Sequence, residues 1–317
     1  MKAPEVSVIM AAHNCGATLG RALESVERQT QTSWELIVID DGSGDDTPAI
    51  LDRHAQADPR IRAIHQENAG ISEVRRRGVE LARGEYVIHF DSDDYATSGM
   101  LADMLAHARH TGADITVADF FSDHPGGRIE THPQRFDTLD AIALTEALLD
   151  RRMHGALWNK LIRRDAYSRF RADFSENLTF GEDMVTIMKM LSKGATVSFM
   201  HKGYYHYCYN NTNSLTSSPT RDGYDRRVRW IEACEPYAGE RFRRHIDAKR
   251  FNAKFFGLIH GLVDRKEFYS YGPNSPRWLP SLVGFRKYQP AMALATLRLY
   301  PLARLWCKAI HRLSRRQ

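Results

Sequence analysis

The 317-residue chain has few cysteines and no long apolar run. Its four cysteines, Cys15, Cys208, Cys234 and Cys307, lie far apart, and this spacing argues against both a zinc site and a disulfide framework. No apolar stretch is long enough to cross a bilayer. The N-terminus reaches its first apolar segment without a charged leader, so no secretory signal is expected. Together these absences predict a protein of a reducing, cytoplasmic compartment.

Acidic residues are scarce in the last third of the chain. Residues 221–317 contain 21 Lys and Arg against 8 Asp and Glu, a net charge of +13, while the whole chain carries +5. Residues 1–220 therefore carry −8. A basic segment of this kind predicts an anionic partner, either a nucleic acid or a membrane surface.

The first 120 residues alternate between strand and helix patterns. Short apolar, β-branched runs predict strands at 6–10, 34–39, 61–64, 86–90 and 115–120, and the segments between them have apolar residues at helical spacing. Such repeated units predict a mostly parallel sheet flanked by helices.

The pattern changes after this region. Residues 121–137 are rich in His, Pro and Gly and are expected to form a loop. Helical spacing returns at 138–150, residues 196–209 are expected to be extended, and helices dominate after 220. The length and the change in pattern predict about two domains.

Two acidic groups follow predicted strands. Asp40-Asp41 ends the second strand, and the run Asp91-Ser92-Asp93-Asp94 ends the fourth. Clustered carboxylates need a compensating positive charge, which a hard divalent cation supplies. The alternative is a solvated acidic turn that caps a helix near Thr97. In parallel sheets ligands bind beyond the carboxyl ends of the strands, where both groups lie, and this favours a functional site.

Several motifs occur along the chain in the same order as in a known protein family. They are Val6-Ser7-Val8-Ile9 with Asn14, Asp40-Asp41-Gly42-Ser43, Asn68-Ala69-Gly70 with Arg75, Asp91-Ser92-Asp93-Asp94, and Gly181-Glu182-Asp183. Over residues 4–216 the chain resembles a family 2 glycosyltransferase with the GT-A fold, of the bacterial surface-polysaccharide type. The resemblance implies a GT-A catalytic domain at 1–220, with a nucleotide-binding half at about 1–120 and an acceptor half at about 121–220. Residues 221–317 form a helical, basic extension.

The resemblance implies a nucleotide-diphosphate sugar donor, usually a UDP-sugar, and transfer with inversion. It places Mn²⁺ or Mg²⁺ on Asp93 and Asp91, with His206 as a weaker candidate ligand. The nucleotide-sugar-binding residues that it implies are Ala11, Ala12, Asn14, Asp41, Arg75, Asp91 and Ser92, with Asp41 on the base. Asp94 lies behind the metal ligands. The segment Asn213-Ser214-Leu215-Thr216 resembles the family's flexible segment near the donor phosphates.

This chain departs from the pattern at Arg76, where an Asn is usual, and at Cys208 or Tyr209, where relatives often carry an arginine. These departures put phosphate contacts from the second segment in doubt. For Arg76 or its neighbour Arg77, a solvated helix charge is the simpler interpretation.

On the acceptor side the resemblance assigns Asp183 as the base that removes a proton from the acceptor hydroxyl. Glu182 and the motif Trp158-Asn159-Lys160 lie on the same side. A structural explanation stands beside each assignment. Acids in the first turn of a helix are favoured by its dipole, and Trp158 fits a packing role equally well.

The C-terminal tail has the pattern of a basic amphipathic helix with a restart at Pro301. Its apolar stripe consists of Leu294, Leu297, Leu305, Trp306, Ala309, Ile310 and Leu313, and its charges of Arg298, Arg304, Lys308, Arg312, Arg315 and Arg316. This composition predicts docking on an anionic membrane surface; packing in a helical bundle is the alternative.

The sequence as a whole predicts a cytoplasmic, peripheral membrane, inverting glycosyltransferase that acts on a saccharide or lipid-linked saccharide. A sugar nucleotidylyltransferase would need a glycine-rich, basic phosphate loop, which residues 11–16 do not supply. A non-catalytic scaffold is disfavoured by the presence of Asp93 and Asp183. A nucleic-acid partner is not expected, because the tail lacks an aromatic stacking platform and the first part is acidic.

Overall fold

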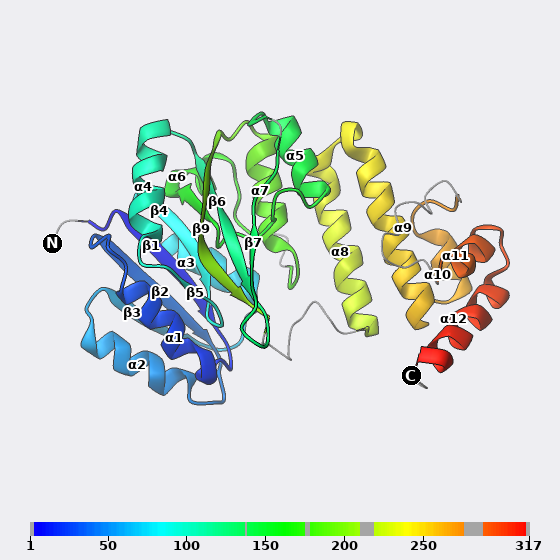
Figure 1. The fold of residues 1–317 in the computed structure, drawn as a ribbon, viewed down its shortest axis with the longest axis horizontal. Coiled ribbons are helices and arrows are strands. Elements are labelled where there is room, and N and C mark those ends of the chain that lie inside the picture. Colours follow the sequence, from blue (N-terminus) through cyan, green and yellow to red (C-terminus); the bar gives the residue numbers. More distant parts are fainter. Residues whose placement is uncertain (1–2, 137, 175–177, 210–218, 276–287, 315–317) are drawn as a thin grey trace. The chain divides into compact units, whose positions relative to one another are not determined.

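The computed structural model describes residues 3–314 except 137, 175–177, 210–218 and 276–287. It divides into two compact units, residues 1–213 and 214–317 (Figure 1). Each unit is described by itself below.

The first unit is built on one mixed sheet with helices on both of its faces (Figure 1). The strand order is β3-β2-β1-β4-β8-β6-β9-β5, and β7 pairs with β6. The strands are β1 (Val6–Ala12), β2 (Trp34–Asp41), β3 (Ile61–Gln66), β4 (Tyr86–Asp91), β5 (Tyr95–Ala96), β6 (Ile115–Asp123), β7 (Ile129–His132), β8 (Lys160–Arg163) and β9 (Val197–Cys208). The expected GT-A-type α/β fold is confirmed in this arrangement.

The predicted parallel arrangement holds for the first four strands, which pair as β3-β2-β1-β4. Beyond β4 the sheet becomes mixed, because β8 runs antiparallel to both β4 and β6, whereas β9 runs parallel to β6. The short connection between β6 and β7 makes a hairpin, in which Gly126 and Gly127 have positive φ values of 87° and 82°. The expectation of a plain loop at 121–137 was therefore wrong, since alternation in short exposed strands is easily masked by turn residues.

Seven helices flank this sheet among the described residues of the first unit. They are α1 (Gly16–Glu27), α2 (Thr47–Ala57), α3 (Ile71–Leu81), α4 (Met100–Thr111), α5 (Ala141–Leu149), α6 (Arg164–Arg169) and α7 (Glu182–Ser192). The core on one face joins Val6, Val8 and Met10 of β1 to the apolar stripes of α1 and α4. On the other face α3 approaches β1 so closely that a Cβ on Gly78 would lie 2.3 Å from Ile9 Cγ2. This packing fixes the strand ends that carry the candidate site.

The second unit is helical, with a core of its own. Its elements are α8 (Arg221–Ala238), the 3-10 turn η1 (Glu240–Phe242), α9 (Arg243–His260), α10 (Arg265–Ser270), α11 (Gln289–Thr296) and α12 (Tyr300–Ser314). Buried residues of α9, including Phe251, Phe255 and Leu258, pack with Ala303 and Cys307 of α12. In the C-terminal tail, α11 ends at Thr296 and a new helix, α12, begins at Tyr300, next to Pro301. No described helix is long and apolar enough to span a membrane.

Candidate functional site

Three parallel strands deliver the predicted donor residues to one edge of the sheet. Ala11 of β1 pairs with Asp91 of β4, and Ala12 pairs with Asp40 of β2. Side chains separated by up to 80 residues in sequence thus become neighbours. The convergence expected from the strand-end rule is present in the structure.

Asp41 organises the turn that precedes α3. Its carboxylate accepts hydrogen bonds from the backbone amides of Ala69 at 2.8 Å and Gly70 at 2.9 Å, and from Gln66 Nε2 at 2.7 Å. Gly70 has a φ of 86°, in the region that favours glycine. The carboxylate predicted to contact the base therefore holds the turn before α3 in place, and its contact with a base stays a prediction.

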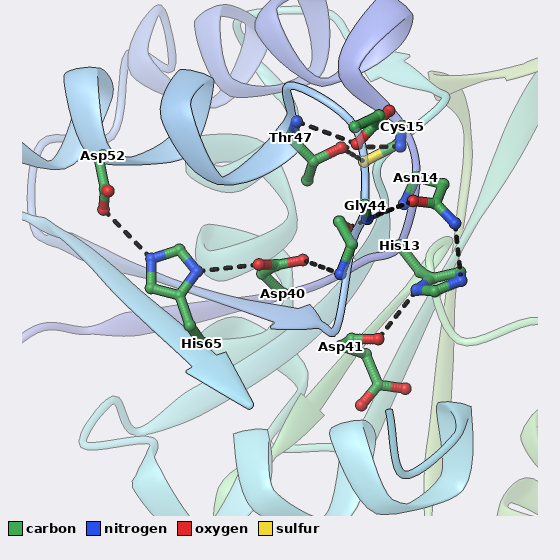
Figure 2. A network of polar contacts seen from close by, with 11 residues as sticks. His13, Asn14, Cys15, Asp40, Asp41, Gly44, Thr47, Asp52 and His65 are labelled. Carbon is green, nitrogen blue, oxygen red and sulfur yellow. Dashed lines mark hydrogen bonds and ion pairs between the residues drawn. The ribbon is translucent and has the colours of Figure 1, made fainter. Parts of the chain in front are cut away.

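Asn14 ties the end of β1 to the loop after β2, as Figure 2 shows. Its side-chain Oδ1 accepts a hydrogen bond from Gly44 N at 2.8 Å, and its own backbone N–H donates to Ser43 Oγ at 2.9 Å. His13, which the sequence reasoning passed over, lies 2.9 Å from the Asp41 carbonyl through Nδ1 and 3.0 Å from Asn14 Nδ2 through Nε2. His13 lies between Ala12 and Asn14, which are both predicted to bind the nucleotide sugar, and this position could have identified it from the sequence.

His65 of β3 links Asp40 to Asp52 of α2 (Figure 2). Its Nδ1 lies 2.9 Å from Asp40 Oδ2 and its Nε2 3.2 Å from Asp52 Oδ1. The hydrogen bond with Asp40 raises the pKa of His65. Burial works to raise the pKa of Asp40, but its hydrogen bonds with His65 and Ser43 outweigh burial and lower it. The hydrogen bond with His65 therefore fixes the Asp40 carboxylate. Through this carboxylate it also fixes Ser43, which contacts Asn14.

Arg75 is the centre of the second half of the site. It is buried, and its guanidinium joins the strand-end acids to the start of α7. Nη1 lies 2.6 Å from Glu182 Oε1 and contacts Asp183, while Nη2 lies 3.4 Å from Asp91 Oδ1. Burial opposes the charge, but Glu182 and Asp91 outweigh it and raise the pKa of Arg75. Arg75 thus connects Asp91, which is predicted to bind the sugar donor, with Asp183, the predicted catalytic base.

The carboxylate of Asp94 is buried, whereas the side chain of Asp91 is 31% exposed. Burial raises the pKa of Asp91 to about 6, a rise that Arg75 opposes and Asp93 reinforces. Asp94 is buried, and its pKa is raised by burial and by the charges of Asp91 and Asp93. Its Oδ1 accepts a hydrogen bond from Cys208 N at 2.7 Å, which anchors the turn to the end of β9. Ser92, next to these acids, is buried.

His206 lies on β9 in an aromatic layer beside this turn. It stacks on Tyr95 with ring centroids 4.3 Å apart and on Phe121 at 4.7 Å. Its Nδ1 lies 2.9 Å from Asp123 Oδ1, and Tyr95 donates to the other oxygen of Asp123 at 2.6 Å. This packing accounts for the burial of His206, and its weak candidacy as a metal ligand stays a prediction.

The motif at 158–160 is turned inward. Trp158 is 2% exposed and stacks on Tyr205 at 4.5 Å, while Asn159 donates to Ala118 O at 2.8 Å. Lys160 is fully buried; burial lowers its pKa to about 7. Its Nζ donates to the carbonyls of His154 and Ala156 and to Asn159 Oδ1 at 2.6–2.7 Å. These three residues hold the 154–159 loop, and their part in acceptor binding stays a prediction.

Glu182 and Asp183 begin α7 after Gly181, whose φ is 74°. Asp183 Oδ2 accepts a hydrogen bond from the backbone N–H of Leu157 at 3.3 Å. The loop held by Lys160 therefore touches the predicted base directly. Sequence order alone did not indicate this contact.

The two departures from the family pattern have different outcomes. Arg76 pairs with Glu73 and Glu80 on its own helix, as expected of a solvated helix charge. Cys208 is buried beside Asp94, and the predicted flexible segment Asn213 to Thr216 lies outside the described residues.

Comparisons with known proteins match this chain to one family. A family model described as "Glycosyl transferase family 2" matches residues 7–173. The chain is 31% identical to the "Uncharacterized glycosyltransferase EpsJ" of Bacillus subtilis, over 71% of this chain and 67% of that protein. It is also 31% identical to the "Succinoglycan biosynthesis protein ExoO" of Rhizobium meliloti, over 65% of this chain and 61% of that protein. About a third or more of each relative lies outside the match.

Among solved structures, the chain is similar to residues 1–349 of S. aureus TarS in complex with UDP-GlcNAc. The TM-score is 0.66 at 19% identity, over 97% of this chain and 92% of that one. At this identity the likeness supports the fold alone.

Proposed function

Because this chain belongs to glycosyl transferase family 2, we propose that it transfers a sugar with inversion from a nucleotide-diphosphate sugar to a saccharide acceptor. The observation that supports this most strongly is the Arg75 cluster. It joins Asp91, at the end of β4, to Glu182 and Asp183, at the start of α7. An enzyme of this kind needs donor phosphates and an acceptor base within reach of one another.

The proposed donor is a UDP-sugar. The related fold of TarS was solved with UDP-GlcNAc and with UDP. In this chain the base and ribose would lie against the ends of β1 and β2, next to Asn14, Asp41 and His13, whose side chains are held by hydrogen bonds. Polar groups that are already held by the chain are suited to orient a nucleotide without further ordering.

The residues at the end of β4 fit a divalent cation. Asp91 and Asp93 offer hard oxygen ligands, and burial together with the charges of the neighbouring acids raises the pKa values of Asp91 and Asp94. In the described part of residues 1–213, Asp91, Asp93 and His206 do not bring three ligand atoms together closely enough to hold an ion by themselves. When bound, Mn²⁺ or Mg²⁺ would neutralise charge on the departing nucleotide diphosphate.

Asp183 is the proposed base. Inversion requires the acceptor hydroxyl to attack from the side opposite the leaving diphosphate and to lose its proton to a nearby group. The Asp183 carboxylate lies in the first turn of α7, where the helix dipole and Arg75 both favour its charged form. The backbone N–H of Leu157 donates to one carboxylate oxygen of Asp183. The other oxygen of Asp183 contacts Arg75, as does the Glu182 carboxylate. This arrangement holds the base in place while it receives the proton.

The proposed acceptor is a saccharide, in surface polysaccharide synthesis and attached to a lipid. The name of ExoO, a succinoglycan biosynthesis protein, supports the pathway class. The first test of the function is a panel of nucleotide sugars, incubated with and without Mn²⁺ and assayed for release of the nucleotide diphosphate. We expect metal-dependent hydrolysis of one UDP-sugar. A protein that binds and hydrolyses none of the panel would contradict the proposal.

The lipid-linked acceptor places the enzyme at a membrane, and α12 is the proposed contact. The structure divides its apolar residues into two faces. Ala303 and Cys307 are buried in the helical core, whereas Leu302, Leu305 and Trp306 are 49%, 61% and 43% exposed. Lys308 is exposed beside them, and the second unit has an excess of basic charge. Exposed Leu and Trp next to basic residues are suited to an anionic lipid surface.

Replacing Leu302, Leu305 and Trp306 together by Ser should release the protein from anionic vesicles while donor hydrolysis persists. The three side chains point away from the core, so the fold should survive, whereas deleting α11 and α12 would remove buried residues. Co-sedimentation with phosphatidylserine vesicles, at low and high salt, measures the effect. Salt should weaken binding of the unaltered protein without abolishing it, because apolar insertion is not screened.

A matched control replaces three exposed apolar residues of the first unit, Ile129, Leu139 and Ile142, by Ser. This control should sediment like the unaltered protein. If the α12 variant also sediments fully, then α12 is an ordinary packing element and the membrane contact lies elsewhere.

A further inference from the structure

Arg21 of α1 reaches across to the acidic turn that follows β4. Its Nη2 donates to the backbone carbonyl of Asp93 at 2.5 Å and lies 3.3 Å from Cys208 Sγ. Its Cζ lies 5.2 Å from the centre of the Tyr95 ring. Contacts with β9, with β5 and with the turn between β4 and β5 therefore fix the guanidinium, although the residue is exposed.

None of these contacts neutralises the charge of Arg21. Cys208 offers the guanidinium a buried thiol sulfur, which is a weak acceptor and not a carboxylate. Asp123, the acid next to Tyr95, accepts from Tyr95 and pairs with His206. In the described part of the chain, the partners of Arg21 are thus a carbonyl, a thiol and an aromatic ring.

The guanidinium also keeps donors in reserve. Both hydrogen bonds in the described structure use Nη2, so Nη1 and Nε remain for an anion. An arginine offers its N–H groups in a planar fork that matches phosphate oxygens, and it stays charged at every physiological pH. A cation held at the carbonyl of Asp93 stands where the proposed donor places its diphosphate.

We propose that Arg21 binds the diphosphate of the nucleotide-sugar donor and stabilises the negative charge on the departing nucleotide. This inference rests on the proposed function. It adds to the site a residue of α1, on the opposite side of the acidic turn from Arg75. The diphosphate would then meet positive charge from two elements, and the aromatic contact with Tyr95 pre-orders the side chain and lowers the entropy lost on binding.

A simpler role is that Arg21 only tethers the turn through the Asp93 carbonyl. The two roles differ in what they require of the side chain. A tether needs a hydrogen-bond donor, which glutamine supplies, whereas a diphosphate contact needs a positive charge, which lysine supplies. The two roles also differ in how the effect on UDP binding depends on the metal. A tether acts only through the position of Asp93, the proposed metal ligand, so its effect requires the metal.

The experiment is calorimetry of UDP binding to Arg21→Gln, Arg21→Lys and the unaltered protein, each with Mn²⁺ and with EDTA. Arg21→Gln should weaken UDP binding by about 10–100-fold with Mn²⁺, the effect expected for losing a charged hydrogen-bonded pair. A loss of similar size should appear wherever binding is measurable in EDTA. Arg21→Lys should retain most of the affinity, because it keeps the charge and loses only the fork.

Arg28→Gln is the matched control. It removes the same charge at the C-terminal end of the same helix, where Arg28 is 66% exposed and pairs with Glu24 at 3.3 Å. It should bind UDP like the unaltered protein, so a general loss of positive charge cannot explain the Arg21 result.

Unchanged affinity in Arg21→Gln, or a loss confined to the Mn²⁺ experiment, would overturn the inference and leave the tether. If the unaltered protein binds no UDP at all, the proposed donor fails instead, and the two failures are thereby distinguished.

Discussion

Asp183→Asn should reduce sugar transfer to the acceptor by about 10²–10⁴-fold, the usual contribution of a well-placed general base. The amide keeps the shape of the side chain and its hydrogen bond with Leu157 N, but it cannot take a proton. UDP affinity in the presence of Mn²⁺ should change little, because the predicted donor residues other than Arg75 lie on or next to β1, β2 and β4, and Arg75 keeps its contacts with Glu182 and Asp91. The measurement is the transfer rate at saturating donor, compared with UDP affinity from calorimetry.

Two control variants separate catalysis from helix capping and from the ion-pair cluster. Asp165→Asn makes the same change in the first turn of α6, where the side chain is 62% exposed. It should leave the transfer rate unchanged. Glu182→Gln disturbs Arg75 without removing the base and should cost less than Asp183→Asn. A variant Asp183→Asn that transfers normally but has lost UDP binding would show that the residue serves the donor side.

Asp93→Asn should abolish most of the metal-dependent part of UDP binding. Altering residues that merely support a metal ligand typically costs about 10–100-fold in affinity, so the loss of a direct ligand should reach at least the upper end of that range. Calorimetry of UDP with Mn²⁺ and with EDTA isolates this part. The EDTA values should be similar in the two proteins, and a thermal melt should confirm that the variant folds.

Equal Mn²⁺-dependent affinity in Asp93→Asn and the unaltered protein would remove Asp93 from the metal site. In that case Asp91, which is bound to Arg75, would be the next residue to alter. The Asp93 and Asp183 results are also informative as a pair, because one should act on donor binding alone and the other on transfer alone.

Local sequence was sufficient for the nucleotide-binding half. β1, β2 and β4 are short apolar runs that are buried on both faces, so that the hydrophobic pattern and the final structure agree for them, whereas β3 is more polar and half-exposed. The positions of Asp41, Asp91 and Asp93 follow from this, because parallel strands end at a common edge. The start of α7 at Glu182 followed from the glycine before it.

The acceptor half could be predicted less well. The hairpin of β6 and β7 was missed, because β7 is a four-residue, half-exposed strand that pairs at the sheet edge. Lys160 was expected near the acceptor and is buried, since three oxygen acceptors from its own loop compensate its charge. A lysine in sequence carries no sign of such partners.

The sequence alone determined the family, the order of the strands along the chain and the identity of the acidic motifs, because these depend on residue type and short-range spacing. Only the tertiary structure decided which of these residues meet. Arg75 joins Asp91 to Asp183, Arg21 reaches the carbonyl of Asp93 from α1, and α12 turns Cys307 inward and Leu305 outward. Such contacts depend on helix packing against the sheet or within the helical core. Packing brings together side chains that no local pattern relates.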